Sequence, residues 1–228
     1  MSTAPAIDKT AIRHAATIML VRDHADGPQV LMGQRGASAA FMPDKFVFPG
    51  GAVDPDDAQV PLGTDLSPLC TARLEAEGGM RAATLAAAAI RELWEETGLM
   101  LGTPGVWPGP PHPDWAQFAA RGMLPAADAL TFVFRAITPP GRPRRFDARF
   151  FLADATRVQG DPTDFSAACE ELSHLQWVPF STARHLNLPF ITEVVLAEAE
   201  ACLRDGGKPG SVPFFDNAQD RSEFRRIA

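Results

Sequence analysis

The chain has 228 residues, with 21 Lys and Arg against 28 Asp and Glu, and its formal net charge is −7. This length suits one domain with a substantial core, and a hydrophobic fraction of 46% excludes a disordered chain of low hydrophobicity. The acidic balance argues against a nucleic-acid binder or a membrane-surface binder, because both would carry a basic field. The three cysteines have no CxxC spacing, so we expect neither a disulfide framework nor a structural zinc site.

The predicted elements interleave strands and helices along the chain. Apolar, β-branched runs bounded by turn residues predict strands over 16–22, 29–35, 46–48, 130–137, 145–152 and 174–178. Helical patterns predict helices over 81–96, 115–121 and 193–203. Segments rich in Asp, Pro and Gly predict irregular structure over 52–80, with room for one short helix, and over 103–113. This alternation predicts a single α/β or α+β domain. No apolar stretch is long enough to span a membrane, and we expect a cytoplasmic protein.

Three glutamates share one stripe of the helix predicted over 81–96. At about 100° per residue, Glu92, Glu95 and Glu96 fall within about 100° of one another. Carboxylates at this spacing repel each other, and the C-terminal end of a helix dipole disfavours anions. A hard divalent cation such as Mg²⁺ would resolve this conflict because it prefers oxygen ligands. A solvated acidic helix face is the alternative explanation.

The residues around these glutamates match a known motif. Residues 91–99 read RELWEETGL and fit the pattern R-E-U-x-E-E-x-G-U, with U aliphatic, of the Nudix box. Residues 48–51 read FPGG and match the strand end and glycine turn that precede the box helix. The chain therefore resembles the Nudix hydrolases. The resemblance implies a Nudix-type α/β/α sandwich with a mixed central sheet.

The spacing within the motif departs from the family pattern. Gly51 and Arg91 are separated by 39 residues, 26 more than the 13 of the standard box. The first glutamate of the box, eight residues before the arginine, would fall at Ala83 and is absent there. Glu75 and Glu77 are candidates to replace it. A long insertion inside the box, together with RRFDARFF at 144–151, resembles the branch that includes a peroxisomal coenzyme A diphosphatase.

The resemblance implies a reaction and a metal site. Nudix hydrolases cleave a diphosphate linked to a nucleoside or a similar group with the help of Mg²⁺ or Mn²⁺. By analogy, Glu95 and Glu96 bind the cation, and Glu92 is either a further ligand or the base that activates water. The carbonyl of Gly51 would complete the coordination, since a glycine lets the backbone approach a metal closely.

Further residues receive roles in the same way. Arg91 lies four residues before Glu95, a spacing at which it would orient that carboxylate. Glu171, six residues before Trp177, resembles an acidic position outside the box that assists as base or ligand. Guanidinium and ammonium groups suit substrate phosphates. The candidates for phosphate binding are Arg35, Lys45, Arg145 and Arg149.

The substrate is open among several anhydrides. The spacing from Leu31 to Gly51 fits a coenzyme A signature and includes Arg35, but Gly33, Gly36, Ala40 and Asp44 depart from it. Coenzyme A or acyl-coenzyme A is the leading candidate, and ADP-ribose or dinucleotides are alternatives. A Nudix-fold binding or regulatory module without catalysis is a further alternative.

The expected organisation is one domain over residues 1–228. It carries an insertion at 52–80 and a C-terminal helical extension at 189–228. The expected partner is a small nucleotide-type diphosphate, and the sequence leaves a homodimer open.

Overall fold

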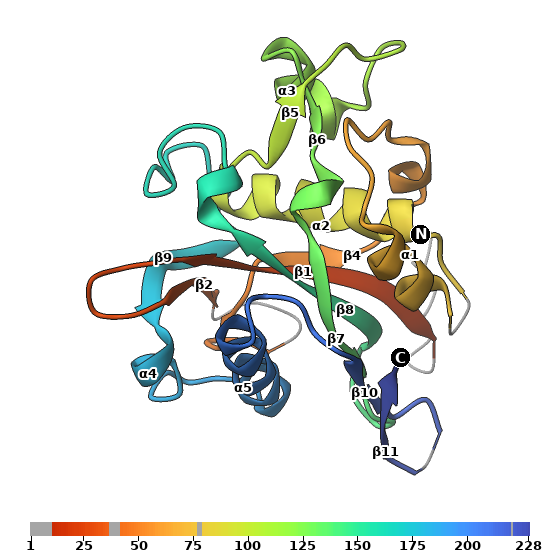
Figure 1. Cartoon of the computed structure of the whole chain (residues 1–228), viewed down its shortest axis with the longest axis vertical. Helices are drawn as coiled ribbons and strands as arrows, with labels where there is room; N and C mark the ends of the chain where they lie inside the picture. Colours follow the sequence, from red (N-terminus) through yellow and green to blue (C-terminus); the bar gives the residue numbers. More distant parts are fainter. Residues whose placement is uncertain (1–10, 37–41, 77–78, 220) are drawn as a thin grey trace, which may run out of the picture.

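The computed structural model describes residues 11–36, 42–76, 79–219 and 221–228 (Figure 1). The strands are β1 (Ile12–Arg22), β2 (Gln29–Arg35), β3 (Phe46–Val47), β4 (Gly50–Ala52), β5 (Gly102–Pro104), β6 (Met123–Pro125), β7 (Thr131–Ile137), β8 (Arg145–Asp154), β9 (Leu172–Pro179), β10 (Val212–Asp216) and β11 (Glu223–Ile227). The helices are α1 (Pro68–Glu75), α2 (Ala82–Thr97), α3 (Ala116–Ala120), α4 (Phe180–Ala183) and α5 (Phe190–Arg204). Short 3₁₀ helices are η1 (Pro55–Gln59), η2 (Pro113–Trp115), η3 (Ala127–Ala129) and η4 (Ala155–Arg157).

Within the described residues, nine strands form one mixed sheet. Its order is β11-β10-β7-β8-β1-β2-β3, with β4 paired to β1 and β9 paired to β2. The pairs β1–β8 and β7–β10 are parallel, and the other pairs are antiparallel. The strands β5 and β6 form a separate hairpin. The predicted mixed sheet is therefore confirmed.

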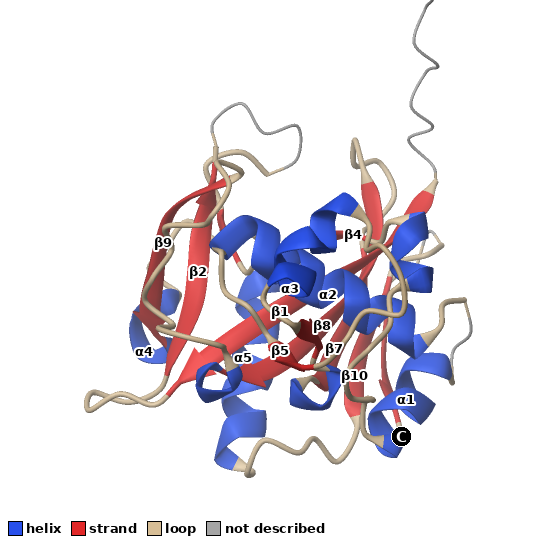
Figure 2. Ribbon diagram, turned by 90° about the horizontal axis from the view of Figure 1, so that it is seen from above, coloured by secondary structure: helices blue, strands red, loops and turns tan. Residues whose placement is uncertain are grey.

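Helices cover both faces of this sheet (Figures 1 and 2). In β1, Ile18 and Leu20 pack with α1 and α2 in one buried cluster, whereas Met19 and Val21 pack with α5 in another. Alternate side chains of a strand point to opposite faces, so β1 must be apolar at both sets of positions. The predicted α/β/α layering follows from this double burial.

The predicted strand 29–35 corresponds to β2, and the helix 81–96 to α2. The region 189–228 differs from the predicted helical extension, because after α5 it continues as β10 and β11. The strand β10 lies parallel to β7, so the end of the chain extends the main sheet. The segment predicted to be irregular over 103–113 begins inside the β5–β6 hairpin. In the described part of the chain, no helix combines the length and apolar character needed to cross a bilayer.

The C-terminal end of α2 is fixed by a glycine. Gly98 has φ 73°, and its N–H donates to the carbonyl of Trp94 at 2.8 Å. A Cβ at residue 98 would come within 2.9 Å of the backbone of Ala167. Just beyond, the N–H of Cys169 donates to the carbonyl of Glu95 at 2.9 Å. The loop that leads into β9 is therefore docked on the helix end that carries the glutamates.

The substitution Gly98→Ala should destabilise the protein. A non-glycine residue in the left-handed region and the overlap with Ala167 should together lower the free energy of unfolding by about 1–3 kcal/mol. Urea denaturation measures this change. The matched control is Gly109→Ala, where a Cβ meets no atom within 4 Å. Equal urea midpoints for the two variants would contradict the assigned constraint.

Candidate active site

The three predicted carboxylates lie at the C-terminal end of α2, which packs on β4. The N–H of Gly50 donates to Oε2 of Glu96 at 2.7 Å. A Cβ at residue 51 would overlap the carboxylate of Glu92, so this approach is possible because Gly51 has none. The FPGG turn and the glutamate helix are therefore in direct contact, although 39 residues separate Gly51 from Arg91.

Arg91 links the parts of this site. Its Nη1 donates to Glu92 at 2.8 Å and to Glu95 at 3.0 Å. Its Nε and Nη2 donate to the two carboxylate oxygens of Asp57 at 2.9 and 3.0 Å, and Nη2 also donates to the carbonyl of Ala52 at 3.1 Å. All three nitrogens are engaged, and the side chain is buried. The guanidinium therefore orients two of the glutamates and ties α2 to η1 and β4.

The sequence reasoning missed Asp57. Counted forward from Gly51, Asp57 stands where the box places its first glutamate, with five residues between them. It is 2% exposed and forms a two-bond pair with Arg91. The 26 extra residues of the box are then 58–83, after the acid rather than before it. The family spacing measured backward from Arg91 points to Ala83, whereas the spacing measured forward from Gly51 points to Asp57.

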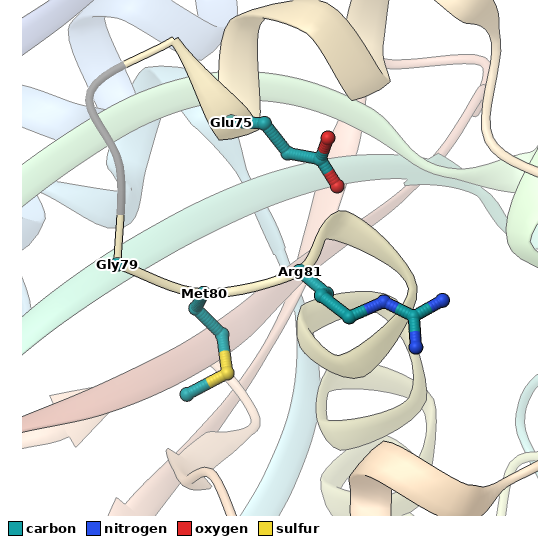
Figure 3. A pocket seen from close by; sticks show the side chains of 4 residues that line it. All are labelled: Glu75, Gly79, Met80 and Arg81. Atoms are coloured by element: carbon teal, nitrogen blue, oxygen red, sulfur yellow. The ribbon is translucent and has the colours of Figure 1, made fainter.

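Glu75, proposed as a replacement for the missing glutamate, has another role. Its Oε1 accepts a hydrogen bond from the N–H of Ala82 at 3.0 Å, which caps the first turn of α2. Glu77, the other candidate, lies outside the described residues. A cavity of about 370 Å³ beside this cap is lined by Glu75, Gly79, Met80 and Arg81 (Figure 3). A second cavity, of about 570 Å³, shares Glu75 and Arg81 with it. Both lie at the end of α2 opposite to the glutamates.

Burial raises the proton affinity of the glutamates. Glu96 is 1% exposed, and its pKa lies well above the ordinary value because of desolvation and the neighbouring charge of Glu92. Desolvation also raises the pKa of Glu92 to about 7, against the opposing effect of Arg91. The pKa of Glu95 is raised as well, by burial and by the charge of Asp114. Burial therefore disfavours the ionised form of these carboxylates, and a nearby positive charge would favour it.

The structure brings Glu171 and Arg35 to the same place. Arg35 lies at the end of β2 opposite Leu172 of β9, and its Nη2 donates to Oε1 of Glu171 at 2.9 Å. The charge of Glu171 raises the pKa values of Glu92 and Glu96. Both side chains therefore border the glutamates.

Three predicted phosphate-binding residues are engaged elsewhere. The ammonium of Lys45 donates to Asn187 at 2.6 Å and to the carbonyl of Leu188 at 3.1 Å. Arg145 is buried and donates to the carbonyls of Thr138, Asn217 and Ala218.

Arg149 is 1% exposed and contacts Asp147 and His14. Arg145 and Arg149, both predicted to bind phosphate, are buried because β8 lies between β7 and β1 in the sheet. Their guanidiniums are used inside the fold.

The donor set fits a hard divalent cation. Among the described residues, no three side chains of His, Cys, Asp or Glu are arranged closely enough to hold a metal ion as they stand. The carboxylates of Glu92 and Glu95 instead share the guanidinium of Arg91. Carboxylate oxygens beside a glycine backbone are nevertheless the ligands such cations prefer. A buried, ionised Glu96 also requires a nearby positive charge.

Known Nudix hydrolases resemble the chain in sequence and in fold. No family model matches the chain. A Caenorhabditis elegans protein named "Putative nudix hydrolase 7" is 30% identical over 178 residues, which cover 73% of this chain and 51% of that protein. The chain thus spans about half the length of the curated relative that it matches.

Solved structures share the fold. The Nudix hydrolase of Alicyclobacillus acidocaldarius superposes with a TM-score of 0.60 at 27% identity, covering 85% of this chain and 96% of that one. The Nudix domain of Shewanella oneidensis NrtR, solved with ADP-ribose, has a TM-score of 0.50 at 15% identity, covering 89% and 94% of the two chains. At that identity it supports the fold alone. The predicted Nudix-type fold is confirmed, and similarity in sequence and in structure supports the resemblance to the Nudix hydrolase superfamily.

The substitution Asp57→Asn should weaken the whole site. Removing one partner of a buried ion pair leaves the guanidinium of Arg91 uncompensated and should cost about 3–5 kcal/mol of unfolding free energy. Urea denaturation measures this loss. The neighbouring Asp56→Asn is the control, because the Asp56 side chain is 53% exposed and should change stability by less than about 1 kcal/mol. Similar losses for the two variants would contradict the role assigned to Asp57.

The metal-free protein should lose stability as the pH rises. Folding raises the pKa of Glu92 from 4.5 to about 7, so between these values the folded state binds more protons than the unfolded chain. The contribution of this group falls over that interval by at most about 1.4 kcal/mol per pH unit. In urea denaturation with a chelator from pH 4.5 to 8, the free energy of unfolding of Glu92→Gln should rise relative to that of the wild type as the pH rises. The exposed Glu170→Gln should stay parallel to the wild type, and parallel behaviour of Glu92→Gln would refute the prediction.

Proposed function

We propose that this protein is a divalent-cation-dependent hydrolase of diphosphates in which a nucleoside diphosphate is linked to a second group. The observation that carries the proposal is the set of carboxylates on α2, held by Arg91 against the glycine turn of β4. The carboxylates of this set repel one another, and a bound cation would compensate that repulsion. Phosphoryl transfer needs this arrangement, because it depends on positioning and charge stabilisation.

In this proposal each carboxylate has a defined role. Glu95 and Glu96 would hold Mg²⁺ or Mn²⁺, with Glu92 and the carbonyl of Gly51 beside them. The bound cation supplies positive charge that offsets the developing charge on the phosphoryl oxygens. Arg91 keeps the carboxylates in place, as its five contacts do in the ligand-free protein.

Two residues are candidates for the base that activates water. Glu92 has a pKa near 7, which suits proton transfer at neutral pH. Glu171 lies beside it with a side chain that is 54% exposed, so water reaches it readily. A glutamine at the residue that acts as base should remove the acidic limb of the pH–rate profile, whereas a glutamine at the other should leave that limb in place.

Coenzyme A or acyl-coenzyme A is the leading substrate proposal. The uninterrupted spacing from Leu31 to Gly51 and the position of Arg35 beside the glutamates support it. Against it, Gly33 replaces the threonine of the signature, and a Cβ there would meet Leu172 and Leu175 at 2.9 Å. ADP-ribose and dinucleotides are the competing substrates. The absence of an acid at Ala83 is a reason to consider a module without catalysis. Asp57 supplies an acid at the corresponding distance from Gly51, so this reason no longer favours that alternative.

The variants Glu95→Gln and Glu96→Gln test the proposed activity. Both variants should fold, but their turnover should fall by more than about 100-fold. Loss of a residue that only supports a metal ligand typically costs roughly 10–100-fold, and a ligand should matter more. The assay uses Mg²⁺ or Mn²⁺ with coenzyme A, acyl-coenzyme A, ADP-ribose, NADH and dinucleoside polyphosphates, with products resolved by mass. The exposed α5 variant Glu193→Gln is the control. Full activity in both glutamine variants, or no hydrolysis of any substrate by the wild type, would refute the proposal.

A further inference from the structure

The ion pair between Arg35 and Glu171 has a fixed place in the fold. Arg35 ends β2, and its neighbour across the sheet is Leu172, the first residue of β9. Glu171 immediately precedes that strand, so the register of β2 and β9 sets the two side chains beside each other. Their contact is the 2.9 Å bond from Nη2 to Oε1. The pair therefore depends on the sheet and not on a free loop.

This contact leaves the guanidinium incompletely satisfied. Nε of Arg35 is buried and has no hydrogen-bond partner among the residues that the structure describes. A buried donor without an acceptor is unfavourable. An additional acceptor, such as a phosphate oxygen, would therefore stabilise Arg35 further. The Glu171 side chain is 54% exposed, whereas that of Arg35 is 21% exposed. The carboxylate can therefore leave the pair toward solvent more easily than the guanidinium can.

Both members of the pair lie near the glutamate end of α2. Two residues before Glu171, the N–H of Cys169 donates to the carbonyl of Glu95 at 2.9 Å, and Glu171 in turn accepts the hydrogen bond from Arg35. Arg35 thus supplements Arg91 as a positive charge beside a group of buried carboxylates. A cation bound by these carboxylates would lie near both members of the pair. It would attract the carboxylate of Glu171 and repel the guanidinium of Arg35.

We propose that Arg35 and Glu171 form an exchangeable ion pair, which opens when a divalent cation is bound by the glutamates and frees Arg35 to bind a substrate phosphate. This inference rests on the proposed function. Once Glu171 has moved toward the cation, the donors of Arg35, including Nε, can turn to phosphate oxygens, which suit a guanidinium fork. Cation binding and phosphate binding are then coupled, and each strengthens the other.

The test is a double-mutant cycle on Mn²⁺ affinity, measured calorimetrically on the full chain without substrate. The four proteins are the wild type, Arg35→Gln, Glu171→Gln and the double variant. In the presence of Glu171, Arg35→Gln should tighten Mn²⁺ binding several-fold, because the carboxylate no longer has to leave a partner. In the Glu171→Gln background, Arg35→Gln should change the logarithm of the Mn²⁺ dissociation constant by less than half as much. Glu170→Gln is the control and should bind Mn²⁺ as the wild type does.

Kinetics at saturating Mn²⁺ provide the second readout. Arg35→Gln should raise KM for the hydrolysed substrate more than it lowers kcat, and Arg35→Lys should recover only part of the loss, since an ammonium lacks the guanidinium fork. Equal effects of Arg35→Gln on Mn²⁺ affinity in both backgrounds, with normal binding and hydrolysis by the wild type, would overturn the exchangeable pair alone. A wild type that neither binds Mn²⁺ nor hydrolyses any substrate would overturn the proposed function and this inference together.

Discussion

The buried contact between Arg91 and Asp57 is the interaction on which the rest of the site depends. A guanidinium buried to this extent requires a carboxylate partner, and Asp57 supplies two hydrogen bonds to it. The remaining donors of Arg91 are then directed at Glu92, Glu95 and the backbone of β4. Since this one side chain joins η1 and β4 to α2, the pair sets the geometry of the carboxylates as well as their charge.

The same network explains how the fold tolerates a group of acids. Among the described residues, Glu96 gains one backbone donor, and Glu92 and Glu95 share one guanidinium, so the buried Glu96 in particular has few donors for an ionised carboxylate. The raised pKa values of all three groups express this deficit. A divalent cation bound between these carboxylates would supply the positive charge that the protein partners do not.

Local sequence patterns predicted the elements that local interactions define, such as β2, α2 and the i, i+4 pair of Arg91 and Glu95. They failed where distant strands decide the outcome. The strand β4 consists of two glycines and an alanine and exists because it pairs with β1. Arg149 is buried because β8 lies parallel to β1, a partner more than a hundred residues away.

The insertion in the box and the η1 turn that precedes most of it contact different parts of α2. Leu66, Cys70 and Leu74, in and just before α1, pack into the core with α2, and Glu75 at the end of α1 bonds to Ala82, at the end of α2 remote from the glutamates. The part near the chemistry is η1, where Asp56 meets His112 at 3.4 Å, and His112 meets Asp114 at 3.0 Å. The charge of Asp114 raises the pKa of Glu95, which puts the segment before α3 beside the carboxylates. Both η1 and the segment before α3 therefore lie toward the glutamate end of α2, whereas α1 and Glu75 lie at its other end.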